Sequence, residues 1–219
     1  MPVVEPSLTL ERRLLREHPI LICLDEVGRG ALAGPVAVGA TVVDAAAARR
    51  RVPQGLRDSK LVPQKRRPEV AERAQAWAPA SAVGWAESTE IDEVGIMRAL
   101  GLAASRAIIA ACADAYDASA ALVILDGNHD YVSAVHPGRL AVRSIIKADR
   151  DCASVAAASV LAKVARDALM VDLSPAYPAY QWERNKGYAS LEHRDAIRAC
   201  GLTPHHRSSW AIADAPTLF

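Results

Sequence analysis

The feature that most constrains this chain is the run Asp25-Glu26-Val27-Gly28-Arg29-Gly30, which directly follows the apolar residues 20–24. The apolar residues predict a buried strand, so two adjacent carboxylates leave a hydrophobic environment and enter a glycine-punctuated bend. Carboxylates in such a place need a cation or several hydrogen-bond donors to offset their desolvation, and only Arg29 lies in the immediate run. A bound divalent metal is one sufficient answer.

The length of 219 residues and the hydrophobic content of 51% predict a folded chain with one sizeable core. We expect a single domain over residues 1–219. Charged or polar residues interrupt every apolar stretch well before the about 18 residues of a membrane span, and the first residues lack the pattern of a signal peptide. We therefore expect a cytoplasmic protein that is a monomer and has no membrane partner.

The spacing of the cysteines and the distribution of charge indicate which metal sites and binding partners the chain can have. The four cysteines are widely spread, which favours reduced thiols over a disulfide or zinc framework; they are Cys23, Cys112, Cys152 and Cys200. The net charge of +1 does not discriminate between partners. Positive charge is concentrated at residues 49–51 and 60–67, a pattern that fits a phosphate-tracking surface and a solvated face equally well.

The hydrophobic pattern predicts an α/β layered domain, because the first half is rich in strands and the second alternates helices with strands. Ser7 is expected to cap the first helix, Ser88 or Thr89 a later one, and the glycines at 28–34 to form an antiparallel hairpin. Expected strands cover residues 20–24, 36–43, 81–87, 121–125 and 140–146, and expected helices 8–16, 63–77, 88–115, 152–171 and 191–200.

Four acidic residues each follow an apolar run at or near the end of an expected strand: Asp25, Glu26, Asp126 and Asp149. Ligand sites in open α/β sheets collect at strand ends, so these acids are expected to converge. Oxygen-only ligands select hard cations such as Mg²⁺ or Mn²⁺. Two such ions about 3.5–4 Å apart would support in-line cleavage of a phosphodiester.

Each acid also has an ordinary structural interpretation. Asp126-Gly127-Asn128 is typical of a turn, and Asp149 suits a helix cap. Neighbours in a regular strand point to opposite faces, so Asp25 and Glu26 share a site only if the backbone breaks there, which the following glycines permit. The glycine pair also suggests a dinucleotide-binding turn, but the third glycine is absent and two acids precede the bend.

Six motifs occur in order along the chain: Asp25-Glu26-Val27-Gly28-Arg29-Gly30, Asp58-Ser59-Lys60, Ile124-Leu125-Asp126-Gly127-Asn128, the helix at 157–167, Asn185-Lys186-Gly187-Tyr188 and His206-Arg207-Ser208-Ser209. Together they resemble the motifs of ribonuclease HII, the type 2 ribonuclease H family of bacteria, from about Ile20 to Trp210. No extra N-terminal domain of the type 3 enzymes is present in the sequence, which favours type 2.

The resemblance implies a ribonuclease H-like mixed sheet flanked by helices, with a helical, substrate-contacting portion at about 175–219. It implies cleavage of RNA in RNA/DNA hybrids and of single ribonucleotides in duplex DNA, leaving 3′-hydroxyl and 5′-phosphate ends. It makes the four acids the catalytic ligands of two Mg²⁺ or Mn²⁺ ions. It assigns recognition of the 2′-hydroxyl to Gly28, Arg29, Gly30 and Tyr188, and phosphate contacts to Lys60, Ser159, Lys163 and again Arg29.

Several of these residues also fit a structural interpretation. Tyr188 also fits a loop tyrosine over the core, and Lys163 also fits a helical ion pair with Asp167. We expect His205-His206 to be structural or at the substrate rim rather than metal ligands. The whole chain also fits a non-catalytic nucleic-acid-binding module of the same fold, or another nuclease of the ribonuclease H-like group.

The sequence departs from the family pattern at two places. Cys23 stands where glycine is usual, and Ala148 stands where Lys-Gly-Asp is common. Both add a side chain near the expected site and put its local backbone geometry in doubt. The last residues, 215–219, fit either a partner peptide or a frayed tail, and we expect the latter.

Overall fold

A five-stranded mixed sheet forms the centre of the protein in the computed structural model, which describes residues 5–113 and 115–210. The strand order is β3-β2-β1-β4-β5. β2 is antiparallel to β1 and β3, whereas β4 is parallel to both β1 and β5. The strands are β1 (Ile20–Val27), β2 (Val36–Asp44), β3 (Ala80–Ala86), β4 (Ala121–Asp126) and β5 (Ala141–Ile145). The predicted α/β class and hairpin are confirmed.

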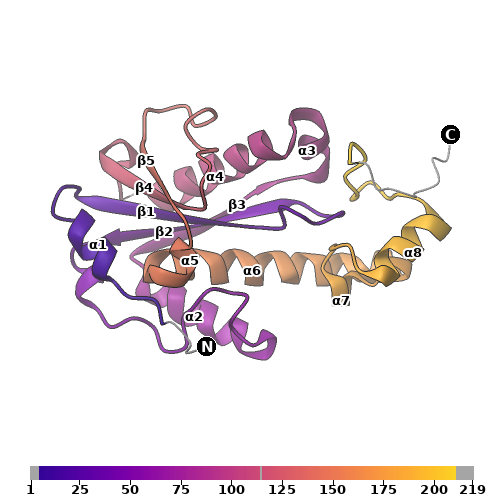
Figure 1. Cartoon of the computed structure of the whole chain (residues 1–219), viewed down its shortest axis with the longest axis horizontal. Coiled ribbons are helices and arrows are strands. Elements are labelled where there is room, and N and C mark those ends of the chain that lie inside the picture. The colour runs from indigo at the N-terminus through magenta and orange to yellow at the C-terminus, as the bar shows by residue number, and fades with distance from the viewer. Residues whose placement is uncertain (1–4, 114, 211–219) are drawn as a thin grey trace.

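Two long helices cover opposite faces of the sheet (Figure 1). α4 (Ile96–Cys112) packs on the face to which Ile22 and Leu24 of β1 point. α6 (Ala153–Leu173) lies on the other face, on the side of Leu21 and Cys23, and α2 (Arg67–Trp77) packs outside it. The two-residue alternation of a strand thus divides the apolar residues of β1 between two cores.

α6 lies very close to the centre of the sheet because small residues face each other there. Gly39 of β2 pairs with Asp25 of β1, and a Cβ atom on Gly39 would lie 2.2 Å from the carbonyl oxygen of Ala158. Buried alanines fill this part of α6. The acidic end of β1 is therefore placed directly under the helix.

The C-terminal helices form a separate small core at the far end of α6, next to the tip of the β1–β2 hairpin (Figure 1). That core contains Met170, Tyr180, Trp182 and Ile197. The shorter helices of the chain are α1 (Thr9–Leu14), α3 (Ser88–Val94), α5 (Ala148–Asp151), α7 (Trp182–Asn185) and α8 (Leu191–Cys200), with 3₁₀ turns η1 (Ala47–Arg49), η2 (Gln64–Arg66), η3 (Ala118–Ala120), η4 (Ser174–Ala176) and η5 (Pro178–Tyr180).

Some expected boundaries and caps were wrong. The helix expected at 88–115 is two helices, because Gly95 has a positive φ of 78° between α3 and α4. Glu87 caps α3 through a reciprocal capping box with Glu90, so neither Ser88 nor Thr89 is the cap. The N-cap of α1 is Leu8 rather than Ser7.

The cysteines, the long helices and the C-terminal tail were also the subject of predictions. All four cysteines are free, and three of them are buried. Within residues 5–113 and 115–210, no helix is both long and apolar enough to span a membrane. The tail at 215–219 lies outside the described residues.

Candidate active site

The four predicted acids come together at one end of the sheet. Pairing of Leu24 with Leu125 brings β1 and β4 into register, so Asp25 and Asp126 leave adjacent parallel strands at the same end. Asp149 follows β5 in the short helix α5, and its backbone N–H donates to Asp126 Oδ1 at 3.2 Å. The convergence of these acids, expected from their positions at strand ends, is present in the structure.

Asp25 and Glu26 share this end of the sheet without a backbone break, and the expected break was wrong. β1 continues in register through the pairs Glu26–Val38 and Val27–Ala37. The two carboxylates therefore leave opposite faces: Asp25 interacts with Ser159 of α6, and Glu26 with Tyr131 on the other side. Both remain near Asp126, whose charge acts on each of them.

Burial and mutual repulsion shape the charge of the cluster. Burial raises the pKa of Asp25 well above its usual range, and the charges of Glu26 and Asp126 raise it further. Burial also raises the pKa of Glu26, which Arg29 opposes with a guanidinium 3.6 Å from the carboxylate. Burial, followed by the charge of Asp126, raises the pKa of Asp149. Such a cluster of like charges is stabilised by a nearby cation.

Lys60 supplies a positive charge to the cluster in this structure. Its Nζ lies 3.2 Å from Asp149 Oδ2 and 3.4 Å from Asp58 Oδ1. Burial opposes the charged form, but the carboxylates of Asp58, Asp25 and Asp149 outweigh it and raise the pKa of Lys60. The residue predicted to contact phosphate is thus also the counter-ion of an acid.

The donor atoms of the cluster suit a hard divalent cation. They are all carboxylate oxygens, and burial raises the pKa of Asp25, Glu26 and Asp149, so a cation beside them would favour their charged forms. Within the described chain, no three acidic, imidazole or thiol groups already lie close enough to hold one ion. Ion binding would therefore require rotation of carboxylate side chains, and Asp149 would have to exchange its contact with Lys60.

The predicted phosphate-contacting residues of α6 are engaged inside the protein. Ser159 is fully buried and its hydroxyl donates to Ser59 at 2.9 Å, linking α6 to the Asp58-Ser59-Lys60 segment. Lys163 forms the alternative ion pair with Asp167 at 2.7 Å, and its Nζ lies 5.6 Å from the centre of the Tyr188 ring. The two helical residues thus lie beside the acids and beside Tyr188, respectively.

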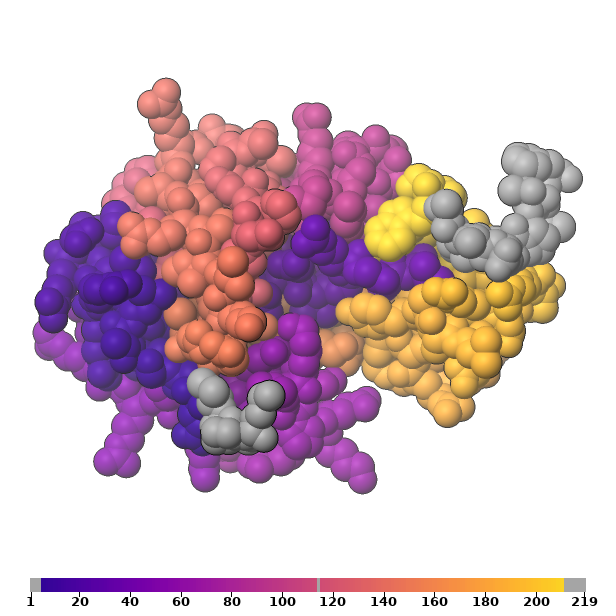
Figure 2. Space-filling view, in the orientation of Figure 1, coloured from indigo at the N-terminus to yellow at the C-terminus, as the bar shows by residue number. Residues whose placement is uncertain are grey.

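The glycine-rich bend and the Tyr188 segment are hydrogen-bonded to each other. The turn closes with a bond from Ala31 N–H to Gly28 carbonyl at 3.1 Å, and Leu32 N–H donates to Gly187 carbonyl at 2.8 Å. Arg166 lies between them, with Cζ 5.4 Å from the centre of the Tyr188 ring. In Figure 2 the violet early part of the chain reaches the surface between orange and yellow segments. The residues predicted to recognise the 2′-hydroxyl thus share one region.

Three residues that contact the acids or the bend had no predicted role: Tyr131, Arg166 and Arg207. Tyr131 is 5% exposed, and its hydroxyl donates to Glu26 Oε2 at 3.3 Å. A lone tyrosine in a loop carries no periodic signal, so this contact was not predictable. Both arginines lie within the quoted motifs, but they are fully buried and donate only to backbone carbonyls, which leave no trace in a sequence.

The histidines have structural positions, one of the two roles expected. His206 is buried and its Nε2 lies 3.1 Å from Nε2 of His193, which also accepts from Trp182 Nε1–H at 3.1 Å. The carbonyl of His205 accepts the N–H of Gly34 at 2.8 Å. This cluster supports the C-terminal core rather than a metal site.

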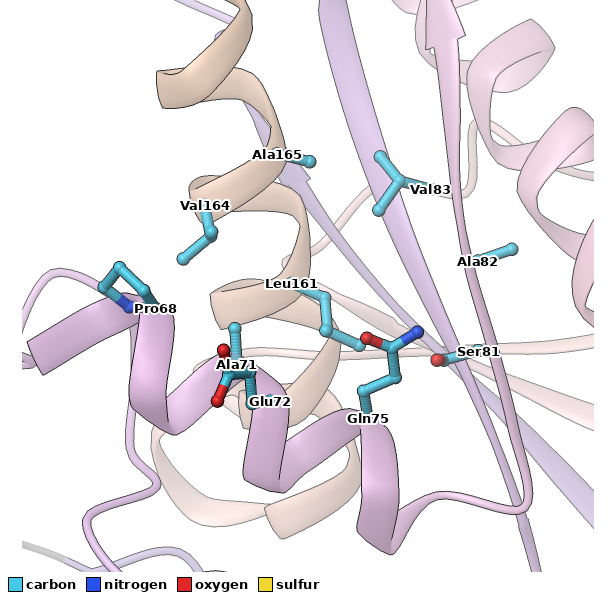
Figure 3. Close-up of a pocket in the computed structure, with 10 residues that line it drawn as sticks. All are labelled: Pro68, Ala71, Glu72, Gln75, Ser81, Ala82, Val83, Leu161, Val164 and Ala165. Atoms are coloured by element: carbon cyan, nitrogen blue, oxygen red, sulfur yellow. The ribbon is translucent and has the colours of Figure 1, made fainter.

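A separate hollow of about 350 Å³ opens between α2, β3 and α6, with Leu161, Val164 and Gln75 in its wall (Figure 3). None of the predicted site residues lines it. The predicted site residues thus lie apart from this hollow.

Solved structures with the same arrangement of elements define the class of fold. The ribonuclease H2 of Pyrococcus horikoshii OT3 superposes with a TM-score of 0.70 at 24% identity, covering 89% of this chain and 95% of that one. Bst-RNase HIII, solved in complex with Mn²⁺, superposes with a TM-score of 0.71 at 22% identity, covering 98% of this chain and 72% of that one. The fold is that of the ribonuclease H enzymes.

Sequence comparison identifies the family within that class. The model of the ribonuclease HII family matches residues 22–213. Ribonuclease HII of Streptomyces avermitilis is 44% identical over 217 residues, 98% of this chain and 88% of the relative. That of Thermus thermophilus is 41% identical over 214 residues, 96% of each chain. The chain belongs to the ribonuclease HII family and is a ribonuclease H endonuclease.

Proposed function

We propose that this enzyme cleaves the RNA strand of RNA/DNA hybrids and single ribonucleotides embedded in duplex DNA, leaving 3′-hydroxyl and 5′-phosphate ends. Convergence of the four acids at one end of the sheet is the observation that carries this proposal. Asp25, Glu26, Asp126 and Asp149 would hold two divalent ions, Mg²⁺ or Mn²⁺. Divalent ions held there would supply the Lewis acidity that phosphodiester hydrolysis needs.

The side chains around the acids have defined parts in this proposal. Tyr131 and Arg29 each contact a different oxygen of Glu26. Ser159 of α6 lies beside Asp25 in a fully buried position, with its hydroxyl donated to Ser59. Lys60 balances Asp149 before the ions bind and afterwards is free to contact a substrate phosphate.

Substrate choice is assigned to the bend at residues 28–30 and to Tyr188. Backbone N–H groups donate hydrogen bonds to a hydroxyl or phosphate oxygen, and the 2′-hydroxyl distinguishes RNA from DNA. Lys163 lies over the Tyr188 ring and is placed to contact the adjacent phosphate. The helical portion from about residue 175 would extend the contact along the duplex, and we propose that a monomer in the cytoplasm suffices.

The test is a substrate panel with the purified protein. Three labelled duplexes are compared in Mg²⁺ and in Mn²⁺: one with a single ribonucleotide, one continuous RNA/DNA hybrid and one all-DNA duplex. Incision 5′ to the lone ribonucleotide and cleavage of the hybrid, with the all-DNA duplex intact, are expected. End-labelling of the products identifies the 3′-hydroxyl and 5′-phosphate.

Two other results would contradict the proposal and favour the alternatives. Tight binding without incision in either metal would indicate a non-catalytic nucleic-acid-binding module. Cleavage of the all-DNA duplex at a similar rate would indicate another nuclease of the same fold class.

A further inference from the structure

Two arginines are buried without a carboxylate partner beneath the bend that contains Gly28 and Gly30. Arg166 of α6 and Arg207 are both fully buried. Within the described chain neither forms an ion pair, and burial lowers the pKa of each, that of Arg207 to about 9. Burying a charged group costs free energy unless it makes several hydrogen bonds, so the contacts of these guanidiniums indicate what the fold gains from them.

All hydrogen bonds of the two guanidiniums go to backbone carbonyls. Arg166 donates to the carbonyls of Pro35, Ala33 and Lys186 at 2.8, 3.0 and 2.9 Å. Arg207 donates to the carbonyls of Gly28 at 2.6 Å, Arg29 at 2.9 Å and Gly34 at 3.0 Å. The two guanidiniums thus bind carbonyls at both ends of the 28–35 segment. Arg166 also binds Lys186, two residues before Tyr188.

This arrangement leaves the opposite side of the turn available. The Gly28 carbonyl accepts the N–H of Ala31, and Arg207 takes the carbonyls of Gly28 and Arg29. The N–H groups of Arg29 and Gly30 donate to nothing in the part of the chain that the structure describes. Gly28 has a φ of 87°, and a Cβ there would lie 2.1 Å from Arg166 Nε, so the turn and the guanidinium fit only with glycine.

We propose that Arg166 and Arg207 are positioning residues for ribose recognition. They hold the carbonyls of the turn inward, so that its free N–H groups face the substrate beside Tyr188, and thereby set the preference for a ribonucleotide. This inference rests on the proposed function, because it concerns the same 2′-hydroxyl. The ligand chemistry is an oxygen acceptor on a ribose or its phosphate.

Lysine is the informative substitution, because it keeps the charge but cannot serve three planar carbonyl directions at once. Arg166→Lys and Arg207→Lys are made in an Asp126→Asn background, which is expected to suppress turnover during the binding measurement. Fluorescence anisotropy gives the affinities for a duplex with one ribonucleotide and for the same duplex in all-deoxy form. Each variant is expected to lose about 10-fold of the ribonucleotide preference, about 1.4 kcal/mol, with little change in all-deoxy affinity.

Tyr180→Phe is the matched control, because it removes a buried hydrogen bond to the Gly201 carbonyl in the same C-terminal core without touching the turn. It is expected to lower the melting temperature and leave the preference unchanged. If Arg207→Lys fails to fold, Trp210→Leu replaces it, since the Trp210 ring lies 4.7 Å from Arg207 Cζ; a 2- to 3-fold loss, about 0.5 kcal/mol, is expected.

The outcomes separate the two proposals. No ribonucleotide preference in the Asp126→Asn protein itself would overturn the proposed function and, with it, this inference. A preference that persists in both lysine variants, or in Trp210→Leu, despite a lower melting temperature would overturn only the positioning role. An equal loss in Tyr180→Phe would do the same, because it would indicate general loosening of the core.

Discussion

The hydroxyl of Tyr131 donates to Glu26 Oε2 at 3.3 Å, and it reaches the carboxylate from the side of the sheet that α4 covers. A buried donor of this kind fixes the direction of a metal-binding carboxylate. Tyr131→Phe is therefore expected to weaken Mn²⁺ binding about 10-fold, measured by calorimetry and by the melting-temperature rise on adding Mn²⁺. Tyr116→Phe, far from the acids, is the control; equal Mn²⁺ affinities in both variants would contradict the role.

Asp126→Asn is expected to keep the fold and to lose most turnover, about 100-fold or more. The amide oxygen can still accept the N–H of Asp149, and one negative charge leaves a repulsive cluster, so the melting temperature should stay equal or rise. Steady-state kinetics at saturating Mg²⁺ test the loss of turnover, and a thermal melt tests the melting temperature. The exposed Asp172→Asn should behave as the unmodified protein, and near-normal cleavage by Asp126→Asn would refute the site.

Tyr188→Ala should reduce cleavage at a single ribonucleotide more than it reduces cleavage of a long hybrid. The ring lies over Lys163 and Arg166 at the edge of the bend, so its loss removes a surface for the sugar while the buried core remains. The measurement is the ratio of kcat/KM for the two substrates beside the melting temperature. Tyr188→Phe keeps the ring and serves as control; equal loss on every substrate in Tyr188→Ala would argue against this role.

Acid should destabilise the C-terminal core through its buried imidazole pair. His193 Nε2 accepts the Nε1–H of Trp182 at 3.1 Å, and His206 Nδ1 accepts the N–H of Thr203 at 2.9 Å, so both rings are neutral. Burial lowers the pKa of His206 from 6.5 to about 4, and repulsion from His193 on protonation lowers it further.

Proton binding determines the direction in which the free energy of unfolding changes with pH. Below about pH 6.5 the unfolded chain binds more protons than the folded one, so the free energy of unfolding falls as pH drops toward about 4. We expect a loss of about 1–2 kcal/mol between about pH 7.5 and pH 5 in urea unfolding. His206→Gln should flatten this dependence, whereas His129→Gln, at an exposed position, should not. A slope unchanged by His206→Gln would contradict the assignment.

Gly39→Ala should destabilise the enzyme at the place where α6 meets the sheet. The new Cβ would lie 2.2 Å from the Ala158 carbonyl oxygen, and a helix backbone cannot move aside cheaply. We expect a loss of about 1–3 kcal/mol and a reduced turnover, because Asp25 is the paired residue on β1. Gly138→Ala, whose Cβ would lie 3.7 Å from its nearest neighbour, controls for the substitution in thermal melts.

The sequence predicted the strands and the convergence of the acids because both depend on local patterns. Apolar runs that end in Asp126 or lead to Asp149 place carboxylates at strand ends whatever the exact boundaries are. The faces of Asp25 and Glu26 were not predictable, because they depend on how far β1 stays paired with β2. The contact between Lys60 and Asp149 also escaped, since it joins segments that meet only in the folded protein.

The pairing of Leu24 with Leu125 joins two strands that leave the ribosome at different times. β1 and β2 can form a hairpin as soon as they leave the ribosome, but Asp126 and Asp149 arrive only after more than half of the chain has been synthesised. The early hairpin therefore carries Asp25 and Glu26 without their repelling neighbours. The repulsion that raises the pKa of Asp25 arises only when β4, which carries Asp126, docks beside the hairpin.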